Sequence, residues 1–391
     1  MTTTQEIMDC ESLHTSGTYP KRDVAIVRGQ GARVWDAEGR EYIDCVAGHG
    51  VALVGHANPA VAEAIARQAR TLITCPGIFY NDQRAAFLEK LTSLAPNGLS
   101  RAFLSNSGAE AVEAAFKLAR LATRRTEIVA TMRGFHGRTM GALSATWRSH
   151  YRKPFEPLVP GFTHVPYDDL EAMEEAVGED TAAVIVEIVQ GEGGVRPGSA
   201  EYFHGLRDLC DERGALLIVD EVQTGFGRTG KLFACEHHDL VPDILCLGKG
   251  IAGGVPMGAT LFGAKVGELP KGSHGSTFGG NPLACAAGLA TLDYIVGEDL
   301  PGQAAEKGAY LLGRLEKIEA PVIREVRGLG LMVGIELRRR VRSYLVALIE
   351  QGVLALPAGS TVLRLLPPLI ISREKLDVVL SAIEEVLTSP L

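Results

Sequence analysis

The chain lacks the sequence features of several protein classes. Its seven cysteines are scattered, odd in number and without a C-x-x-C pair, which argues against a disulfide framework and a cysteine zinc site. No apolar run approaches the roughly 20 residues that a membrane helix needs, and no basic, then apolar, leader opens the sequence. An excess of positive charge is also missing: the net charge is -8, which does not suit a nucleic-acid partner. These absences predict a cytoplasmic protein that binds small molecules and holds no metal.

The chain does have a long middle section in which strand and helix patterns alternate, which is the signal of an α/β fold. Several strand candidates are unbroken aliphatic runs, as expected for a parallel sheet covered by helices on both faces. The predicted strands are 102–105, 128–132, 162–166, 182–189, 215–222, 244–247 and 259–263, and the predicted helices include 108–122, 201–213 and 282–295. We therefore expect a large domain at residues 57–285 with a mostly parallel, seven-stranded, doubly wound sheet.

The two ends of the chain differ from the middle. Residues 24–45 contain short strand-like pieces separated by glycines, and a final amphipathic helix is predicted at residues 373–387. We expect residues 1–56 and 286–391 to form a smaller α+β domain built from both termini.

A carboxylate and a lysine follow two successive predicted strands. The run LLIVDEVQ (216–223) is apolar until Asp220, and the run PDILCLG (242–248) leads to Lys249. A carboxylate that ends such a strand needs a cationic or protonated partner. Pyridoxal 5'-phosphate (PLP) requires this pair, because a lysine forms a Schiff base with it and an aspartate pairs with its pyridinium nitrogen. A structural salt bridge is the alternative for Asp220, and a surface amine is the alternative for Lys249.

Two further polar loops follow predicted strands, where open α/β sheets bind ligands. SNSGAE (105–110) begins a predicted helix whose free amides suit a phosphate, and Gly108 and Ala109 would allow the phosphate to approach the backbone closely. A simple helix cap is the alternative explanation of this motif. RGFHGRT (133–139) offers Phe135 for stacking on a ring and Arg138 for holding a carboxylate, with core packing as the alternative for Phe135.

Two more loops contain polar residues of interest. Glu192 lies in QGEGG (190–194), where it is an ordinary solvated side chain unless an arginine pairs with it. The segment KGSHGSTFGGNP (271–282) is rich in glycine and hydroxyls, so Ser276 and Thr277 are candidates for anion binding.

In this order and spacing, the segments resemble the class III (ornithine type) aminotransferases of PLP fold type I, over nearly the whole chain. The motifs that carry the resemblance are SNSGAE, FHGRT, DEVQTGFGRTG, the lysine at 249 with its following glycine, and STFGGNP. The resemblance implies PLP as the cofactor and a homodimer with shared active sites, in which Gly108, Ala109 and the other subunit's copy of Thr277 hold the phosphate. Phe135 and Val222 would enclose the ring.

The resemblance also implies roles for the residues around the ring. Asp220 would protonate the ring nitrogen, Gln223 would bond the phenolic oxygen, and Lys249 would be both the Schiff-base residue and the proton shuttle.

The resemblance implies further that the enzyme accepts glutamate through its α-amine and a partner substrate through an amine at its far end. Arg364 matches the arginine that grips the α-carboxylate of glutamate, and Glu192 matches the carboxylate that neutralises this arginine for the other substrate. Arg138 and Ser276 would bind the substrate, Arg138 at the carboxylate remote from the reacting centre. His49, between two glycines, would contact that substrate at the pocket mouth or be an ordinary loop histidine. Ile188 stands where many relatives have proline, which puts the reach of Glu192 in doubt.

Three segments, 26–39, 325–334 and 353–359, are most similar to the lysine-biosynthetic branch of this family. Those enzymes aminate an aminoadipate semialdehyde that is attached to an acidic carrier protein, LysW, with glutamate as donor and 2-oxoglutarate as co-product. Two basic clusters are candidates for binding such a carrier: Arg124 with Arg125, and Arg338, Arg339, Arg340 with Arg342. A solvated surface is the alternative for both.

Other activities remain as alternatives. Acetylornithine aminotransferases of arginine biosynthesis are close relatives of the lysine branch. A PLP aminomutase, a decarboxylase or another ω-aminotransferase would share Lys249 and Asp220, but the presence of both Glu192 and Arg364 favours a transaminase that uses glutamate. A non-catalytic protein on this fold would be expected to lose Lys249 or Asp220.

Overall fold

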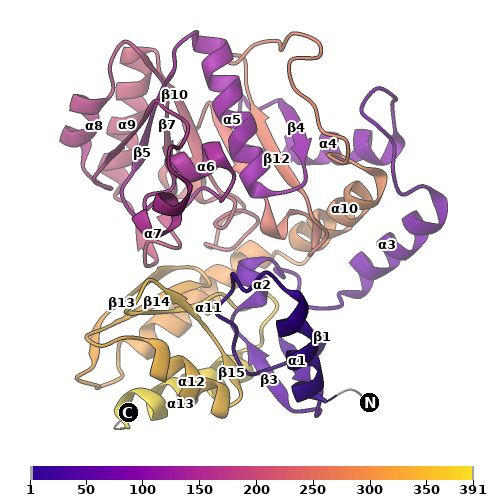
Figure 1. The fold of residues 1–391 in the computed structure, drawn as a ribbon, viewed down its shortest axis with the longest axis vertical. Coiled ribbons are helices and arrows are strands. Elements are labelled where there is room, and N and C mark those ends of the chain that lie inside the picture. Colours follow the sequence, from indigo (N-terminus) through magenta and orange to yellow (C-terminus); the bar gives the residue numbers. More distant parts are fainter. Residues whose placement is uncertain (1–2, 390–391) are drawn as a thin grey trace.

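A seven-stranded sheet forms the centre of the upper lobe in Figure 1. The computed structural model describes residues 3–389. In the order β4-β12-β11-β10-β7-β5-β6, β12 is antiparallel to both neighbours and the other strands run in one direction. The strands are β4 (Arg101–Ser105), β5 (Glu127–Thr131), β6 (Phe162–Val165), β7 (Thr181–Val186), β10 (Leu216–Asp220), β11 (Ile244–Leu247) and β12 (Gly258–Phe262). The predicted mostly parallel α/β sheet is confirmed.

Both faces of this sheet are buried, which explains why its strands are apolar throughout. In β10, Leu217 and Val219 pack in one apolar cluster with α8 (Leu170–Ala176) and α9 (Ala200–Arg213). Leu216 and Ile218 point the other way, into a second cluster with α5 (Gly108–Thr123) and α6 (Met140–Ala145). Since burying each large aliphatic side chain contributes about 1.5–3 kcal/mol, the sheet is a rigid support for whatever lies at its edge.

The other helices of this lobe lie beside the sheet or at its lower edge. α10 packs against α3 and α4, and the segment between α3 and α4 projects at the right of Figure 1. These elements are α3 (Pro59–Thr71), α4 (Asp82–Leu94), α7 (Ser149–Arg152) and α10 (Pro282–Gly297). Within the described part of the chain, none of the helices combines the length and the apolar character that crossing a membrane requires.

The lower lobe joins the two ends of the chain. Its first sheet pairs β3 with β15 in parallel, so Ile43 lies opposite Val353. The elements are β1 (Ile26–Gln30), β2 (Arg33–Asp36), β3 (Glu41–Asp44) and β15 (Val353–Leu354) in one sheet, and β13 (Ile323–Leu329), β14 (Met332–Leu337), β17 (Val362–Leu365) and β16 (Leu356–Ala358) in another. Its helices are α1 (Thr4–His14), α2 (Ala47–Gly50), α11 (Leu300–Leu315), α12 (Arg342–Glu350) and α13 (Arg373–Thr388). The domain boundaries near residues 56 and 285 stay a prediction.

One predicted strand, 182–189, is shorter in the structure. β7 ends at Val186, and β8 (Val189–Gln190) then pairs with β9 (Arg196–Pro197) in a separate hairpin. The chain turns at Glu187, whose buried carboxylate accepts hydrogen bonds from two loop amides outside the sheet. Glu192 therefore lies in the loop of this hairpin, between β8 and β9.

Candidate active site

Asp220 and Lys249 lie at the ends of two neighbouring strands, at the same edge of the sheet, as the sequence predicts. β10 and β11 are parallel, and Asp220 lies opposite Cys246. The chain then continues through Gly248 to Lys249, which has a positive φ of 45° at the start of a short 3-10 turn. Burial lowers the pKa of the Lys249 amine. A lysine in this setting holds its proton less firmly than one at the surface.

The Asp220 carboxylate is buried and held from two sides. Its Oδ2 lies 2.7 Å from Nδ1 of His136, and its Oδ1 accepts a hydrogen bond from the Val222 amide at 3.0 Å. Burial acts against the charged form of His136, but the hydrogen bond and charge of Asp220 outweigh it and raise the pKa of the imidazole. Sequence reasoning did not assign a role to His136, although it stands in the FHGRT motif.

Glu187 is a second residue that sequence reasoning missed. Its Oε1 accepts a hydrogen bond from the amide of Phe135 at 2.9 Å, and its Oε2 accepts one from the amide of Gly191 at 3.1 Å. One buried carboxyl group thus ties the loop that carries Phe135 to the hairpin that carries Glu192. Burial raises the pKa of Glu187 to about 7. The signal in the sequence was a lone acidic residue inside an apolar run, which must find buried partners.

The N-terminus of α5 lies close to these groups. A Cβ placed on Gly108 would come within 2.5 Å of Cγ1 of Val222, so only glycine lets the helix approach Val222 this closely. Ser107 caps the helix through the Glu110 amide, and the amides of the first turn remain available to an anion. Both readings of SNSGAE, helix cap and anion site, are therefore compatible with the structure.

The residues at this edge fit PLP. Free helix amides suit its phosphate, a buried carboxylate suits its ring nitrogen, and a lysine of lowered pKa suits its aldehyde. The two residues predicted to enclose the ring both adjoin this carboxylate site. Phe135 is half-buried and precedes His136, the partner of Asp220, and Val222 follows Asp220 by two residues. Ser276 also lies nearby, because its Oγ is 3.1 Å from Nδ2 of Asn106. Thr277 is exposed in this single chain.

The buried Arg364 forms an ion pair with the partly buried Glu192. Nη2 of Arg364 is 2.6 Å from Oε1 of Glu192, and Nη1 donates to Oε1 of Gln223 at 3.2 Å. The Arg364 side chain is inaccessible to solvent. Burial works against ionisation of Glu192, but the charge and hydrogen bond of Arg364 prevail and hold its pKa below the usual range. The concern that Ile188 would keep Glu192 from reaching its arginine is thus not borne out.

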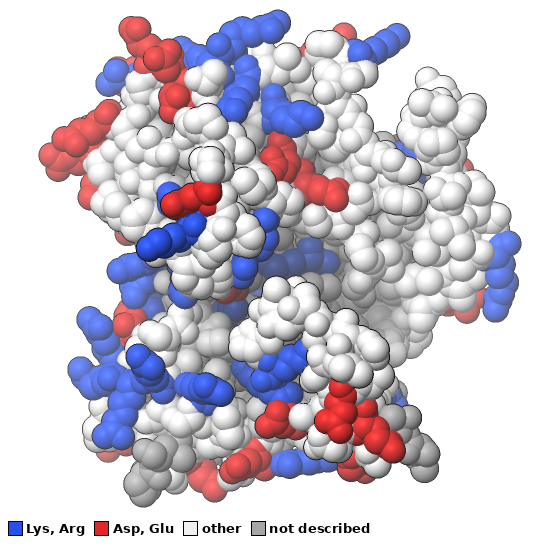
Figure 2. Space-filling view, viewed as in Figure 1, with Lys and Arg blue, Asp and Glu red and all other residues white. Residues whose placement is uncertain are grey.

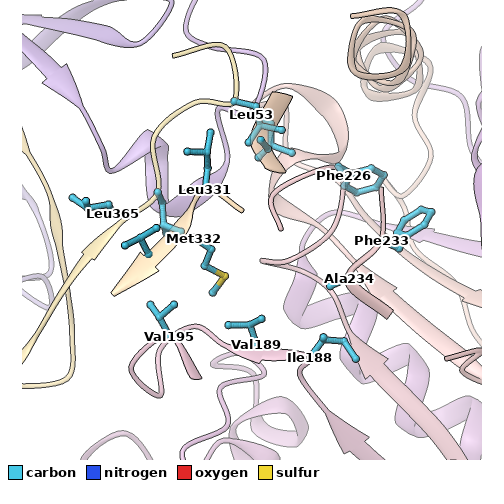
Figure 3. Packing of buried hydrophobic residues seen from close by; sticks show 14 of the residues in the cluster. Leu53, Ile188, Val189, Val195, Phe226, Phe233, Ala234, Leu331, Met332 and Leu365 are labelled. Atoms are coloured by element: carbon cyan, nitrogen blue, oxygen red, sulfur yellow. The ribbon is translucent and has the colours of Figure 1, made fainter. Parts of the chain in front are cut away.

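Gln223 is tightly enclosed beside this pair. A Cβ on Gly191 would lie 2.0 Å from Oε1 of Gln223, so the glycine before Glu192 permits the contact. Figure 3 shows Met332 of β14 pointing toward Val189, which begins β8, and Val195, which directly precedes β9. The lobes therefore meet around Glu192 with apolar packing on one side and the ion pair on the other.

Two further predicted residues lie at the rim. The guanidinium of Arg138 is exposed and stacks 3.7 Å above the ring of Tyr151. His49 has a positive φ of 63° within α2 and is exposed. Partial burial, and then the positive charges of Arg364 and Lys249, lower the pKa of His49. These effects favour the neutral form of His49.

The predicted basic pair Arg124 and Arg125 is not part of this site. α5 runs away from the sheet edge for 16 residues, or about 24 Å, before it reaches them. Arg125 donates hydrogen bonds to the carbonyls of Thr181 and Arg213, where β7 begins and α9 ends. Its role is to join elements at the opposite edge of the sheet.

Comparisons with known proteins agree with this site. The profile of the family described as aminotransferase class-III matches residues 16–387. A LysW-aminoadipate semialdehyde transaminase of Deinococcus radiodurans is 52% identical, over 97% of this chain and 89% of that protein. An acetylornithine aminotransferase of Methanopyrus kandleri is 50% identical, over 98% of each chain. An ornithine aminotransferase structure from Toxoplasma gondii superposes with a TM-score of 0.96 at 36% identity, covering 99% of this chain and 94% of that one.

The chain therefore belongs to the class-III aminotransferases. It is a PLP-dependent transaminase, as its sequence motifs predict.

Proposed function

We propose that this enzyme transfers the amino group of glutamate to the terminal aldehyde of LysW-bound aminoadipate semialdehyde, giving carrier-bound lysine and 2-oxoglutarate. The ion pair between the buried Arg364 and Glu192 supports the first part of this proposal. Glutamate must present an α-carboxylate beside the reacting carbon, whereas a terminal aldehyde has no carboxylate there. An arginine that is alternately neutralised by Glu192 and by glutamate serves both substrates.

The chemistry at the sheet edge follows from the same residues. PLP, when bound, acts as an electron sink for the reacting carbon of the substrate. Asp220 keeps the ring nitrogen protonated, and His136 holds the Asp220 carboxylate in place. The Lys249 amine, with its lowered pKa, would take the proton from the substrate carbon and deliver it to the carbon on the other side of the substrate nitrogen. Gln223 would bond the phenolic oxygen through its amide nitrogen, since its Oε1 faces Arg364.

Other site residues would complete the substrate pocket. Arg138 would leave its stacking contact with Tyr151 to bind the carboxylate remote from the reacting centre, and His49 and Ser276 would line the pocket. Thr277 would reach the phosphate of a second copy of the chain in a homodimer. An exposed apolar segment supports a dimer interface: Leu72, Ile73, Ile78, Phe79 and Tyr80 are exposed, as is Phe278 next to Thr277.

An acidic carrier would bind the remaining basic cluster. Arg338 to Arg340 and Arg342 are exposed and lie beside Ser360 and Thr361, to which Val341 and Leu337 are hydrogen-bonded. Figure 2 shows Lys and Arg side chains gathered at the left of the cleft between the lobes and on the lower lobe below it. If the carrier binds there, its apparent affinity should weaken steeply with added salt.

A second candidate substrate is acetylornithine, because relatives with that name are nearly as similar as the LysW-named one. To decide, the pyridoxamine form of the purified enzyme is mixed with carrier-bound aminoadipate semialdehyde or with N-acetylglutamate semialdehyde. The return of the PLP absorbance is then timed. Faster return with the carrier-bound substrate is expected, and preference for the free acetylated substrate would overturn the assignment. A lack of any spectral change with glutamate would refute transamination from glutamate.

The cytoplasmic location stays a prediction.

The proposed exchange between Glu192 and glutamate has its own test. Glu192→Ala should change the ratio of the two half-reaction rates, because only one substrate needs Arg364 neutralised by the protein. An unchanged ratio would exclude the exchange.

A further inference from the structure

Behind the hairpin that carries Glu192 lies a cavity lined with arginine. It has a volume of about 250 Å³ and lies between the lobes. Arg133, Arg148, Gly193 and Arg196 line it from the upper lobe, and residues 358–362 with Glu336 line it from the lower lobe. A neighbouring cavity of about 510 Å³, walled by Trp147 and Tyr167, shares Arg133 and Arg196 with it. The active-site chemistry described above uses none of these arginines.

Positive charge is in excess around this cavity. Among the described residues, Glu336 is the only carboxylate in its lining, and it already pairs with Arg196 at 3.0 Å, Arg327 at 2.7 Å and Arg324 at 3.2 Å. Arg133 forms no hydrogen bond or ion pair within residues 3–389, and Nε of Arg196 is buried without a partner there. Burial, and then the charges of Arg327 and Arg133, lower the pKa of Arg196. Such crowding of like charges favours binding of an anion.

Arg133 also has a strained backbone. Its φ of 68° is in the left-handed region, which a residue with a long side chain rarely adopts. Arg133 directly precedes the loop of Phe135, and its carbonyl lies against Gly193 of the hairpin. Strain of this kind persists where the surroundings impose it, often at functional sites.

Two residues that line the cavity, Arg148 and Val362, connect it to the ion pair of Arg364 and Glu192. Nη2 of Arg148 donates to the backbone carbonyl of Glu192 at 2.7 Å, and Val362, two residues before Arg364 on β17, lines the cavity. An anion that binds Arg148 competes with that carbonyl for the guanidinium. Anion binding would therefore loosen the hairpin that holds Glu192.

We propose that Arg133, Arg148 and Arg196 form a second anion site, which binds a phosphate or carboxylate group and eases the departure of Glu192 from Arg364. The binding step stands on the cavity alone, whereas the effect on Glu192 rests on the proposed function. The anionic group could be a free ion or an acidic side chain of a bound partner, because both present the same oxygens to the arginines.

The test uses the PLP-loaded enzyme, in which the cofactor's own phosphate fills the α5 site. Inorganic phosphate, and separately a hexaglutamate peptide, are titrated by calorimetry at constant ionic strength. Arg133→Gln should weaken binding about tenfold or more, the loss expected for a charge-assisted hydrogen bond. Arg133 has no partner to lose within residues 3–389, so this variant should fold normally. The matched control is Arg213→Gln, which removes the same charge from an exposed residue at the far end of α9.

The two probes distinguish the sources. Phosphate binding that Arg133→Gln weakens assigns the site to a free anion, and binding of the peptide alone assigns it to acidic side chains of a partner. Binding of neither probe, or equal losses in both variants, would overturn the proposal. In stopped-flow measurements, the bound probe should raise the rate of the glutamate half-reaction, relative to the half-reaction with the second substrate, by at least about twofold. Arg133→Gln should abolish this change in the ratio of the two rates. Binding without a rate effect would refute the link to Glu192 while leaving transamination untouched.

Discussion

The close contact between Gly108 and Val222 gives a sharp test of how the cofactor site is built. In Gly108→Ala, the added Cβ would lie 2.5 Å from Cγ1 and 2.8 Å from Cγ2 of Val222, against about 3.5–4.0 Å for an ordinary carbon contact. Gly108 does not have a positive φ, so the backbone conformation itself tolerates alanine. The cost is therefore one of packing, and overpacking of this kind destabilises by about 1–3 kcal/mol.

Either α5 or Val222 must move to relieve the contact. If α5 moves, its first amides would shift away from the position expected for the phosphate of PLP, and the loss of one charge-assisted hydrogen bond would weaken cofactor binding about tenfold. Urea unfolding of the cofactor-free protein measures the first effect, and a PLP titration followed by absorbance measures the second. The double variant Gly108→Ala with Val222→Ala removes both methyl groups and should recover most of the stability.

Gly297→Ala is the matched control, because no atom lies within 4 Å of the position that its added Cβ would take at the end of α10. This variant should be neutral or slightly stabilising, as alanine is the better helix former. Two results would refute the reasoning: Gly108→Ala as stable as Gly297→Ala, or a double variant no more stable than Gly108→Ala.

Three further predictions concern buried groups. Burial raises the pKa of Glu221 from 4.5 to about 7, so the folded protein binds more protons than the unfolded chain in this range. The stability of the protein should therefore fall as pH rises, by about 2 kcal/mol between pH 5 and 7. In urea unfolding at several pH values, Glu221→Gln should flatten this decline, and a wild-type stability that rises over this range would contradict the sign. His136→Ala leaves Oδ2 of Asp220 without its partner, so kcat should fall about tenfold or more in both half-reactions with PLP still bound; a loss confined to one half-reaction would contradict it. In Arg364→Lys, the lysine cannot bind a carboxylate with two parallel hydrogen bonds. Single-turnover rates with glutamate should therefore fall about tenfold, while those with the second substrate change little. Equal losses with both substrates would argue against the role assigned to Arg364.

The sequence predicts the sheet and the position of Asp220 and Lys249 well, for a physical reason. Strands buried on both faces must be apolar throughout, and parallel strands end at a common edge, so residues that follow such runs come together. β11 lies where the apolar run predicts it, at Ile244–Leu247. The polar residues that follow these strands therefore indicate the candidate site without any knowledge of three-dimensional contacts.

Contacts between residues distant in sequence were beyond such reasoning. His136 reaches Asp220 across 84 positions, and Arg148 reaches the Glu192 carbonyl from the extended residues just before the short helix α7. Glu187 was included in a predicted strand because its neighbours are apolar, although its carboxyl group needed partners from two loops. Hydropathy patterns report which residues are buried, but not which polar groups satisfy one another.

The proposed exchange at Arg364 would be selective because the arginine is buried. If Glu192 left without a replacement, the guanidinium would be an uncompensated buried charge, which costs about 3–5 kcal/mol. Its contacts with Oε1 of Gln223 and, at 3.4 Å, the Pro357 carbonyl keep the guanidinium in place but are too weak to replace a carboxylate. Only a ligand that brings its own carboxylate to this point can displace Glu192 without that cost. In this proposal a substrate with a bare terminal aldehyde would leave the ion pair closed, so that one fixed pocket would accept two substrates of different charge.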